Sequence, residues 1–280
     1  MLGPVVASVR WVPAVLVGSS LWGVVVLADQ SLSVRTRGAG WVLSFYPSAG
    51  EGGGCFVPSI LPSRSYVARG SARDPERAAE EAGRRARAKL RRYCAANRLN
   101  RLGTLTYRGD GCHDPRELRA DVAEFFRALR TELGGDPLAY VWVPEWHKSG
   151  HGLHVHFAVG RFVPRGLIST AWGRGFVHIK LLGDLPVGST SLGEARVAAR
   201  YLSKYVTKTF ADPAARVAGL HRYDVAQGFQ PPVLKLHGRS PDDVVDQASE
   251  LLGLQPALRW ASADVEDWAG PPAIWAQWAR

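Results

Sequence analysis

A chain of 280 residues, 46% of them hydrophobic, is long enough to bury a substantial core, which excludes an intrinsically disordered protein. Lys and Arg number 35 against 25 Asp and Glu, a formal charge of +10 at pH 7, so an anionic partner such as nucleic acid is favoured over a small neutral substrate. The three cysteines are odd in number and widely spaced, which argues against a disulfide framework or a zinc knuckle and favours a reducing compartment.

The N-terminal region divides into an apolar part and an irregular part. The uncharged run of residues 11–28 has the length of a signal peptide or a minimal membrane span, but its proline and glycines weaken it as a helix, and a misassigned start codon would produce a similar run. We therefore expect a cytoplasmic protein without stable membrane association. Residues 31–72 are rich in Gly, Ser, Pro and Arg, and we predict irregular structure there.

A strongly basic helix follows. Asp74 and Pro75 form a helix start, with Asp as the N-cap and Pro in the first turn, and the helix continues to about Asn97. Its apolar positions are mainly alanines and Leu90, so we expect most of it to face solvent or a phosphate backbone. The candidate DNA-binding side chains on this helix are Arg84, Arg85, Arg87, Lys89, Arg91 and Arg92.

The remaining elements describe an α+β fold with an antiparallel central sheet and flanking helices. Alternation predicts strands over 102–107, 139–146, 153–159, 176–182 and 223–229. Helical spacing and start signals predict helices over 114–133, 164–172, 191–210 and 242–252.

A candidate metal site lies on the paired strands. His154 and His156 alternate with Val155, so their imidazoles project from one face of a strand, about 7 Å apart. If residues 147–152 form a hairpin loop, Glu145 on the neighbouring strand adds a carboxylate. Because imidazole accepts Mn²⁺ or Zn²⁺ and the carboxylate suits Mg²⁺ or Mn²⁺, we expect a divalent ion, Mg²⁺ or Mn²⁺.

A candidate nucleophile lies on the helix over 191–210. Tyr201, Tyr205 and Lys208 fall at i, i+4 and i+7 and share one face, at the border of the apolar stripe. Tyrosine, with a pKa of about 10, cuts DNA only when a metal polarises the phosphate and cations lie nearby; Lys204 and Lys208 are the candidate cations. Taken singly, the tyrosines fit core packing and the lysines a solvated face.

The combination of these motifs resembles the HUH endonucleases, specifically the rolling-circle replication proteins of small phages and bacterial plasmids. The threonine-rich strand from Leu102 to Tyr107, then Glu145 with His154-Val155-His156, then Y-x-x-K-Y-x-x-K from Tyr201 follow the family's three motifs in chain order. Tyr201 and Tyr205 match the paired tyrosines of its third motif. The resemblance covers roughly residues 90–230.

The resemblance implies a palm-like sheet similar to that of RNA-recognition motifs, in a nuclease domain over residues 73–232 led by the basic helix, with residues 233–280 as a tail with an accessory helix. It implies that the tyrosines cut single-stranded origin DNA by transesterification, leaving a 5′-phosphotyrosine and a 3′-hydroxyl that primes synthesis. Two tyrosines allow alternating attacks. Because no Walker-type run is present in the sequence, a host helicase and polymerase are expected partners.

Other functions stay open. A transposase or relaxase shares this chemistry and differs in substrate and genetic context. A non-catalytic basic DNA-binding protein predicts binding without a covalent adduct, with Trp142, Trp146 or Trp172 as candidates for base stacking. A histidine-triad hydrolase is disfavoured because Ala158 stands where its third histidine is needed, and a cupin barrel because no glutamate follows the histidine pair.

Overall fold

The computed structural model describes residues 38–59, 67–68, 70–180, 182, 185, 188–211 and 221–279, apart from the side chains of 209–211. Residues from Gly38 onward form one compact unit. The uncharged run of residues 11–28 lies outside the described residues. None of the helices in the described ranges is long and apolar enough to cross a membrane.

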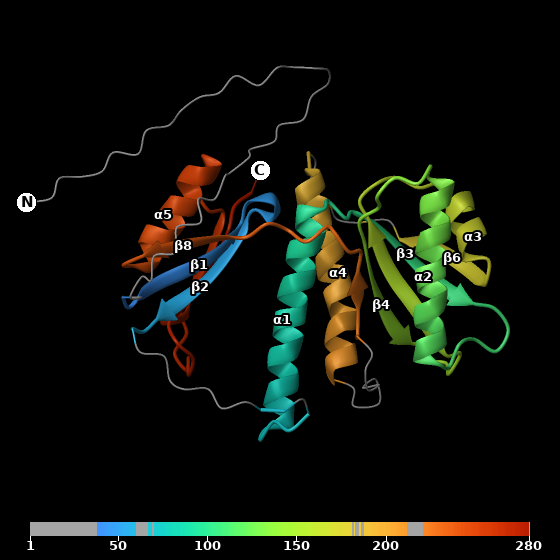
Figure 1. The fold of residues 1–280 in the computed structure, drawn as a ribbon, viewed down its shortest axis with the longest axis horizontal. Coiled ribbons are helices and arrows are strands. Elements are labelled where there is room, and N and C mark those ends of the chain that lie inside the picture. The colour runs from blue at the N-terminus through green and yellow to red at the C-terminus, as the bar shows by residue number, and fades with distance from the viewer. Residues whose placement is uncertain are drawn as a thin grey trace, which may run out of the picture. The chain divides into compact units, whose positions relative to one another are not determined.

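An antiparallel sheet in the order β6-β3-β5-β4-β7 carries the candidate site (Figure 1). Its strands are β3 (Arg101–Tyr107), β4 (Tyr140–Trp146), β5 (Leu153–Val159), β6 (Gly175–Lys180) and β7 (Asp224–Val225). Every residue of β5 is buried, because the strand has neighbours on both edges and helices on both faces. The α+β class and the antiparallel sheet predicted from the sequence are confirmed; the strand predicted over 223–229 is shortened to two residues.

The hairpin of β4 and β5 fixes which side chains meet. The loop between the strands is closed by the backbone N–H of His147, which donates to the carbonyl of Gly152 at 2.8 Å. The register pairs Glu145 with His154, as the sequence predicts, and on its other edge β5 pairs His156 with Thr104. Paired residues of an antiparallel sheet point to the same face, so these side chains converge.

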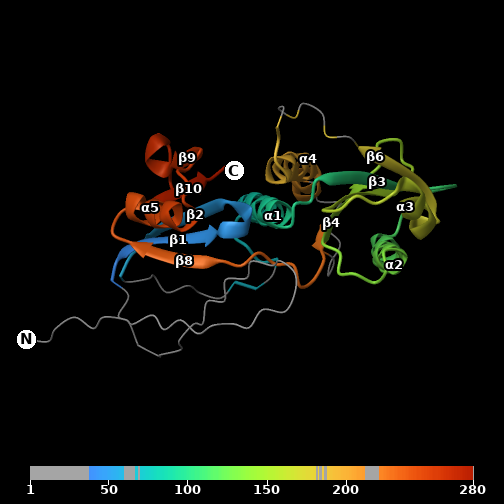
Figure 2. The ribbon, with the colours of Figure 1, turned by 90° about the horizontal axis from the view of Figure 1, so that it is seen from above.

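Helices cover the sheet on both faces (Figure 2). Helices α2 (Pro115–Glu132) and α3 (Arg165–Trp172) bury one face, where Val155 and Phe157 pack against α2. Helix α4 (Ser191–Ala211) packs on the other face, and α1 (Pro75–Ala96) packs on α4.

The prediction that α1 is mostly solvated is wrong on one side of the helix. Leu90, Tyr93 and Cys94 are fully buried, and Ala86 is nearly so. Small side chains at this position let two helices approach closely, so a stripe that is weak in hydrophobicity still forms a tight contact. The opposite side of α1 keeps its exposed cations.

A second antiparallel sheet is formed from both ends of the described chain, in the order β8-β1-β2-β10-β9. Its strands are β1 (Gly40–Tyr46), β2 (Glu51–Val57), β8 (Leu234–Gly238), β9 (Leu258–Ala261) and β10 (Ala273–Gln277), and the short 3₁₀ helices η1 (Pro47–Ala49) and η3 (Ser262–Asp264) lie between strands. Helix α5 (Pro241–Leu252) covers one face, where its valines pack with Phe45 and Trp278.

This sheet corrects two expectations. The irregular structure predicted for residues 31–72 is wrong for residues 40–57, which form β1 and β2. Glycines concealed the strand: a Cβ at Gly54 would lie 2.4 Å from the carbonyl oxygen of Val42, so the close approach of β1 requires glycine. The segment 233–280, predicted as a tail with a helix, contains strands of the same sheet as well as α5. The domain boundaries themselves stay a prediction.

Substitution of Gly103 tests how tightly β3 is held over β5. An added Cβ would lie 2.4 Å from the ring of Phe157, which is itself buried in the core, so we expect Gly103→Ala to lower the free energy of unfolding by about 1–3 kcal/mol in urea denaturation. Gly166 in α3 has open space around it, so Gly166→Ala is the matched control and should be neutral or stabilising. Equal stability of both variants would contradict the packing described here.

Candidate functional site

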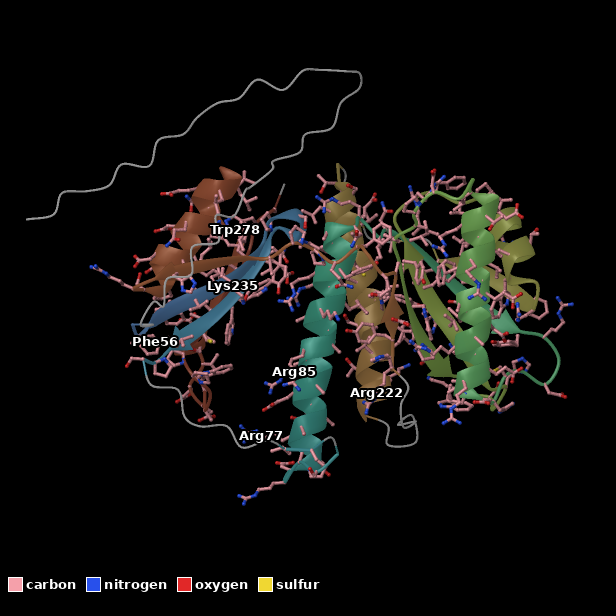
Figure 3. All side chains as sticks on the ribbon, viewed as in Figure 1. Phe56, Arg77, Arg85, Arg222, Lys235 and Trp278 are labelled. Atoms are coloured by element: carbon pink, nitrogen blue, oxygen red, sulfur yellow. The ribbon has the colours of Figure 1, made fainter. Side chains whose placement is uncertain are left out.

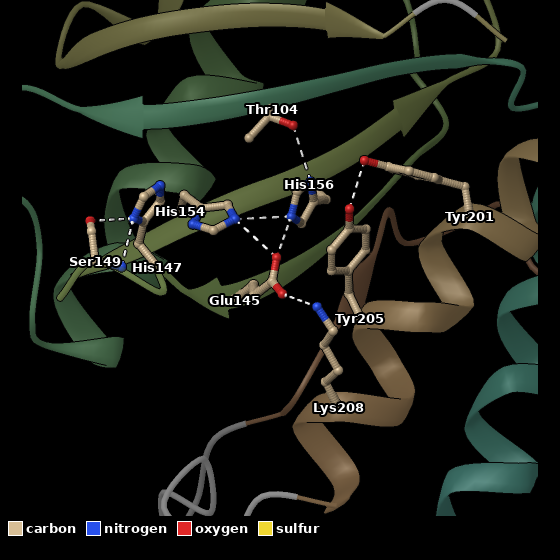
Figure 4. A network of polar contacts seen from close by, with 9 residues as sticks. All are labelled: Thr104, Glu145, His147, Ser149, His154, His156, Tyr201, Tyr205 and Lys208. Carbon is tan, nitrogen blue, oxygen red and sulfur yellow. Dashed lines mark hydrogen bonds and ion pairs between the residues drawn. The ribbon is translucent and has the colours of Figure 1, made fainter. Parts of the chain in front are cut away.

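Three potential metal-ligand atoms converge on the face of the sheet covered by α4 (Figure 4). The Oε2 atom of Glu145 lies 3.1 Å from Nε2 of His154 and 2.9 Å from Nε2 of His156, and the two nitrogens are 3.0 Å apart. His154 and His156 are 9% and 5% exposed. The structure thus brings together the three residues predicted from the sequence; their metal binding stays a prediction.

Thr104 holds one of the imidazoles in place. Its Oγ1 lies 3.0 Å from Nδ1 of His156, a contact that orients the ring and leaves Nε2 directed at the cluster. The sequence places Thr104 in a strand thought to be mainly structural, and only the register of β3 on β5 reveals this contact. Nδ1 of His154 is buried and has no hydrogen-bond partner in the described part of the chain.

Burial keeps both imidazoles neutral. Desolvation lowers the pKa of His156 to about 4 and lowers that of His154, in each case against the opposing effect of Glu145. Burial alone would raise the pKa of Glu145, but hydrogen bonds from Lys208 and His156 outweigh it and hold that pKa below its usual value. At neutral pH the cluster is therefore two neutral imidazoles and a carboxylate, the protonation state that binds a metal.

The cluster fits a divalent cation. Adjacent ligands of an octahedral ion with bonds of about 2.1 Å lie about 3 Å apart, and the three donor atoms have that spacing. Two imidazoles and one carboxylate on one side of an ion leave its remaining positions open. Without a cation, the nitrogen lone pairs and the carboxylate oxygen would face one another. The residues therefore fit a metal whose identity the geometry alone does not fix.

Two tyrosines lie beside this cluster on α4. The ring of Tyr205 stacks on His156, with centroids 3.6 Å apart and an interplanar angle of 16°, and its hydroxyl donates to Oη of Tyr201 at 2.6 Å. Burial, together with this hydrogen bond, raises the pKa of Tyr205 above its ordinary value. Leu202 and Val206, in the predicted apolar stripe, are fully buried, so the tyrosines lie at the border of the core as expected.

Three lysines surround the tyrosines. Lys208 donates to Oε1 of Glu145 at 2.6 Å, with its Nζ 5.3 Å from the ring centroid of Tyr205. Lys204 and Lys180 place their Nζ atoms 5.9 and 5.0 Å from the ring centroid of Tyr201. Lys180, at the end of β6, is absent from the sequence-based set, because nothing in its local pattern shows that β6 ends beside α4.

The candidate DNA-binding cations of α1 separate into two groups. Arg91 donates twice to Glu51, at 2.8 and 3.0 Å, and Arg92 lies over the ring of Tyr46, so both contact the second sheet. Arg84 and Arg85 have exposed side chains near Glu81, and Lys89 is exposed as well; Arg85 projects outward from α1 in Figure 3. Arg87 donates to Thr207 of α4. Phosphate contact stays a prediction, best suited to the exposed group.

The tryptophans proposed for base stacking differ in exposure. Trp172 is fully buried and Trp142 is 5% exposed, so both belong to the core. Trp146, at the end of β4, is 39% exposed. Only Trp146 of these three offers a ring face to a ligand.

Comparison with known proteins supports a role in replication. Residues 100–210, from the residue before β3 to the end of α4, match the family model of the replication-associated proteins named for ORF2 and the gene 2 protein. This range contains the Glu145, His154 and His156 cluster, both tyrosines and the three lysines. No curated protein and no solved structure matches the chain.

The contact from Thr104 predicts a measurable effect on metal affinity. Thr104→Val keeps the side-chain shape and removes the hydroxyl beside Nδ1 of His156, so we expect Mn²⁺ affinity, measured by isothermal titration calorimetry, to fall by about tenfold. Thr106→Val is the control on the same strand, because no hydrogen bond of its hydroxyl is described. His156→Ala should remove binding. Unchanged affinity in Thr104→Val would show that this hydroxyl does not position the ligand.

Proposed function

We propose that this protein is a replication initiator that nicks single-stranded DNA at an origin by tyrosine transesterification. The observation that carries the proposal is the stacking of Tyr205 on His156, because it places a pair of tyrosine hydroxyls beside a cluster suited to a divalent ion. The family match over residues 100–210 supports replication over transposition or conjugation. A host helicase and polymerase in the cytoplasm would complete the process.

The proposed reaction exchanges one phosphate ester for another. A tyrosine oxygen attacks the phosphorus, the bond from phosphorus to the 3′-oxygen breaks, and the tyrosine proton is balanced by protonation of the released 3′-hydroxyl. The products are a 5′-phosphotyrosine and a 3′-end that primes synthesis. Lys180, Lys204 and Lys208 bind phosphate oxygens and balance the charge of the attacking phenolate. An Mg²⁺ or Mn²⁺ ion held by Glu145, His154 and His156 would polarise the scissile phosphate.

Covalent capture tests the reaction directly. The protein is incubated with labelled single-stranded DNA carrying candidate origin sequence and Mn²⁺, and a denaturing gel is searched for a protein-DNA band. We expect a band that EDTA prevents, that His154→Ala reduces by about 100-fold or more, and that the Tyr201→Phe, Tyr205→Phe double variant lacks.

The control for this experiment is Tyr223→Phe, a half-buried tyrosine that lies outside the cluster. A band that survives in the double tyrosine variant would assign the covalent link elsewhere. Strong DNA binding with no adduct, across a broad sequence pool and several metals, would favour the non-catalytic DNA-binding protein.

The two tyrosines differ in their surroundings, which suggests an order of attack. The hydroxyl of Tyr205 donates to the oxygen of Tyr201, and a donated hydrogen bond stabilises a phenolate. Two lysines lie near the ring of Tyr201, whereas the lysine near Tyr205 is engaged by Glu145. We propose that Tyr201 makes the first cut and Tyr205 the second.

Single variants test this order. We expect Tyr201→Phe to abolish the first adduct, and Tyr205→Phe to form it while failing to transfer the strand to a second acceptor. The measurement is adduct formation followed by release on addition of a second labelled oligonucleotide. Loss of the first adduct in Tyr205→Phe alone would reverse the assignment.

The exposed cations of α1 predict a salt effect. Each phosphate neutralised on single-stranded DNA contributes about −0.7 to the slope of log affinity against log salt concentration. Replacing Arg84, Arg85 and Lys89 with Ala should therefore make the slope shallower by about 2. Replacing Arg127 of α2, which is also exposed, serves as the control. An unchanged slope in the triple variant would place the DNA elsewhere.

A further inference from the structure

A cavity of about 360 Å³ opens near the beginning of β3, within the size range of small-ligand pockets. Its walls are mainly apolar and include Phe157 of β5, Ile179 of β6 and Phe162 in the segment after β5. Phe162 is 72% exposed, which is unusual for a large apolar ring and leaves its face free for a ligand. The size and the aromatic wall suit a flat heterocycle.

Two polar groups line the same cavity. Nδ2 of Asn100 donates to Oε2 of Glu194 at 2.5 Å, and Asn100 is 9% exposed. Oδ1 of Asn100 is buried without a hydrogen-bond partner in the described part of the chain. Glu194 is half-buried, and no ion pair with it is found among the described residues. Hydrogen-bond acceptors therefore predominate here, an arrangement that favours a ligand rich in N–H donors.

The cavity is connected to the tyrosine site. Lys180 lines it and also places its Nζ 5.0 Å from the ring centroid of Tyr201. Glu194 and Tyr201 are seven residues apart on α4, so they share a face about 10 Å apart along the helix. A DNA strand whose phosphate reaches Tyr201 can therefore deliver a nearby base to the cavity.

We propose that the cavity binds one unstacked guanine base of the DNA strand, a few nucleotides from the cut, and so determines sequence specificity. Guanine is the base whose pairing edge has two adjacent N–H donors, N1–H and the N2 amino group, which match the two oxygens of the Glu194 carboxylate. Adenine and cytosine place an acceptor beside their amino group, and thymine flanks its single donor with two carbonyl oxygens. The ring of Phe162 stacks on the base.

This inference rests on the proposed function for the identity of the polymer, but base binding is measured separately from nicking. The full-length protein is mixed in turn with dGMP, dAMP, dCMP and dTMP, and affinity is determined from ligand-observed saturation-transfer NMR. These mononucleotides contain no phosphodiester to cut, so the Tyr201→Phe, Tyr205→Phe double variant should bind them as the unaltered protein does. Base binding and adduct formation can therefore fail independently.

We expect dGMP to bind most tightly and Glu194→Gln to weaken it by about tenfold or more, because an amide retains the contact with Asn100 but supplies one acceptor instead of two. Glu117→Gln is the matched control, since Glu117 also lies in the first turn of a long helix but is remote from the cavity lining. Equal affinity for all four nucleotides, or dGMP affinity unchanged in Glu194→Gln, would overturn the assignment of guanine.

Phe162→Ala provides a second test that does not depend on the polar groups. The side chain is largely exposed, so its loss should leave the melting temperature unchanged while weakening dGMP binding several-fold. Phe176→Ala removes a ring that is 70% exposed and absent from the cavity lining, and it should have no effect. Identical dGMP binding in both phenylalanine variants would show that the base is not held in this cavity.

Discussion

The backbone hydrogen bonds that place β5 between β4 and β3 determine which side chains meet. In this register Glu145 lies opposite His154, and Thr104 lies opposite His156. A slip by one residue would turn the imidazoles toward α2 and bring Val155 to the face of α4. Because β5 is buried along its whole length, such a slip would also bury polar groups in an apolar core, so the packing that stabilises the sheet maintains the site.

The site itself balances burial against charge. Desolvation favours the neutral imidazoles, whereas the carboxylate keeps its charge through contact with Lys208. Lys208 thus holds a cation next to a cluster suited to another cation, which is unfavourable unless an anion lies between them or the lysine turns toward it. A DNA phosphate supplies that anion, so the lysine and a metal ion can share one substrate group.

Much of the site could be predicted from the sequence because its geometry depends on local periodicity. Alternation on a strand places His154 and His156 on one face, and helical spacing places Tyr201 above Tyr205. Contacts that depend on tertiary placement could not be predicted: Lys180 approaches Tyr201 only because β6 and α4 come together, and Arg91 turns from a presumed phosphate ligand into the partner of a buried glutamate. Glycines at the β1 and β2 pairing hid two strands because close packing there excludes side chains.

The second sheet joins segments from opposite ends of the described chain, since β2 pairs with β1 on one edge and with β10 on the other. During synthesis, β1 and β2 leave the ribosome first and wait for β10 with an open strand edge, while the elements from β3 to α4 can already fold. Glu51 is needed by Arg91 of α1 throughout that interval, yet the strand that carries it gains its second neighbour last. Completion of this sheet therefore reports that the rest of the chain has been made, and a prematurely ended chain would present an unpaired β2 edge open to aggregation.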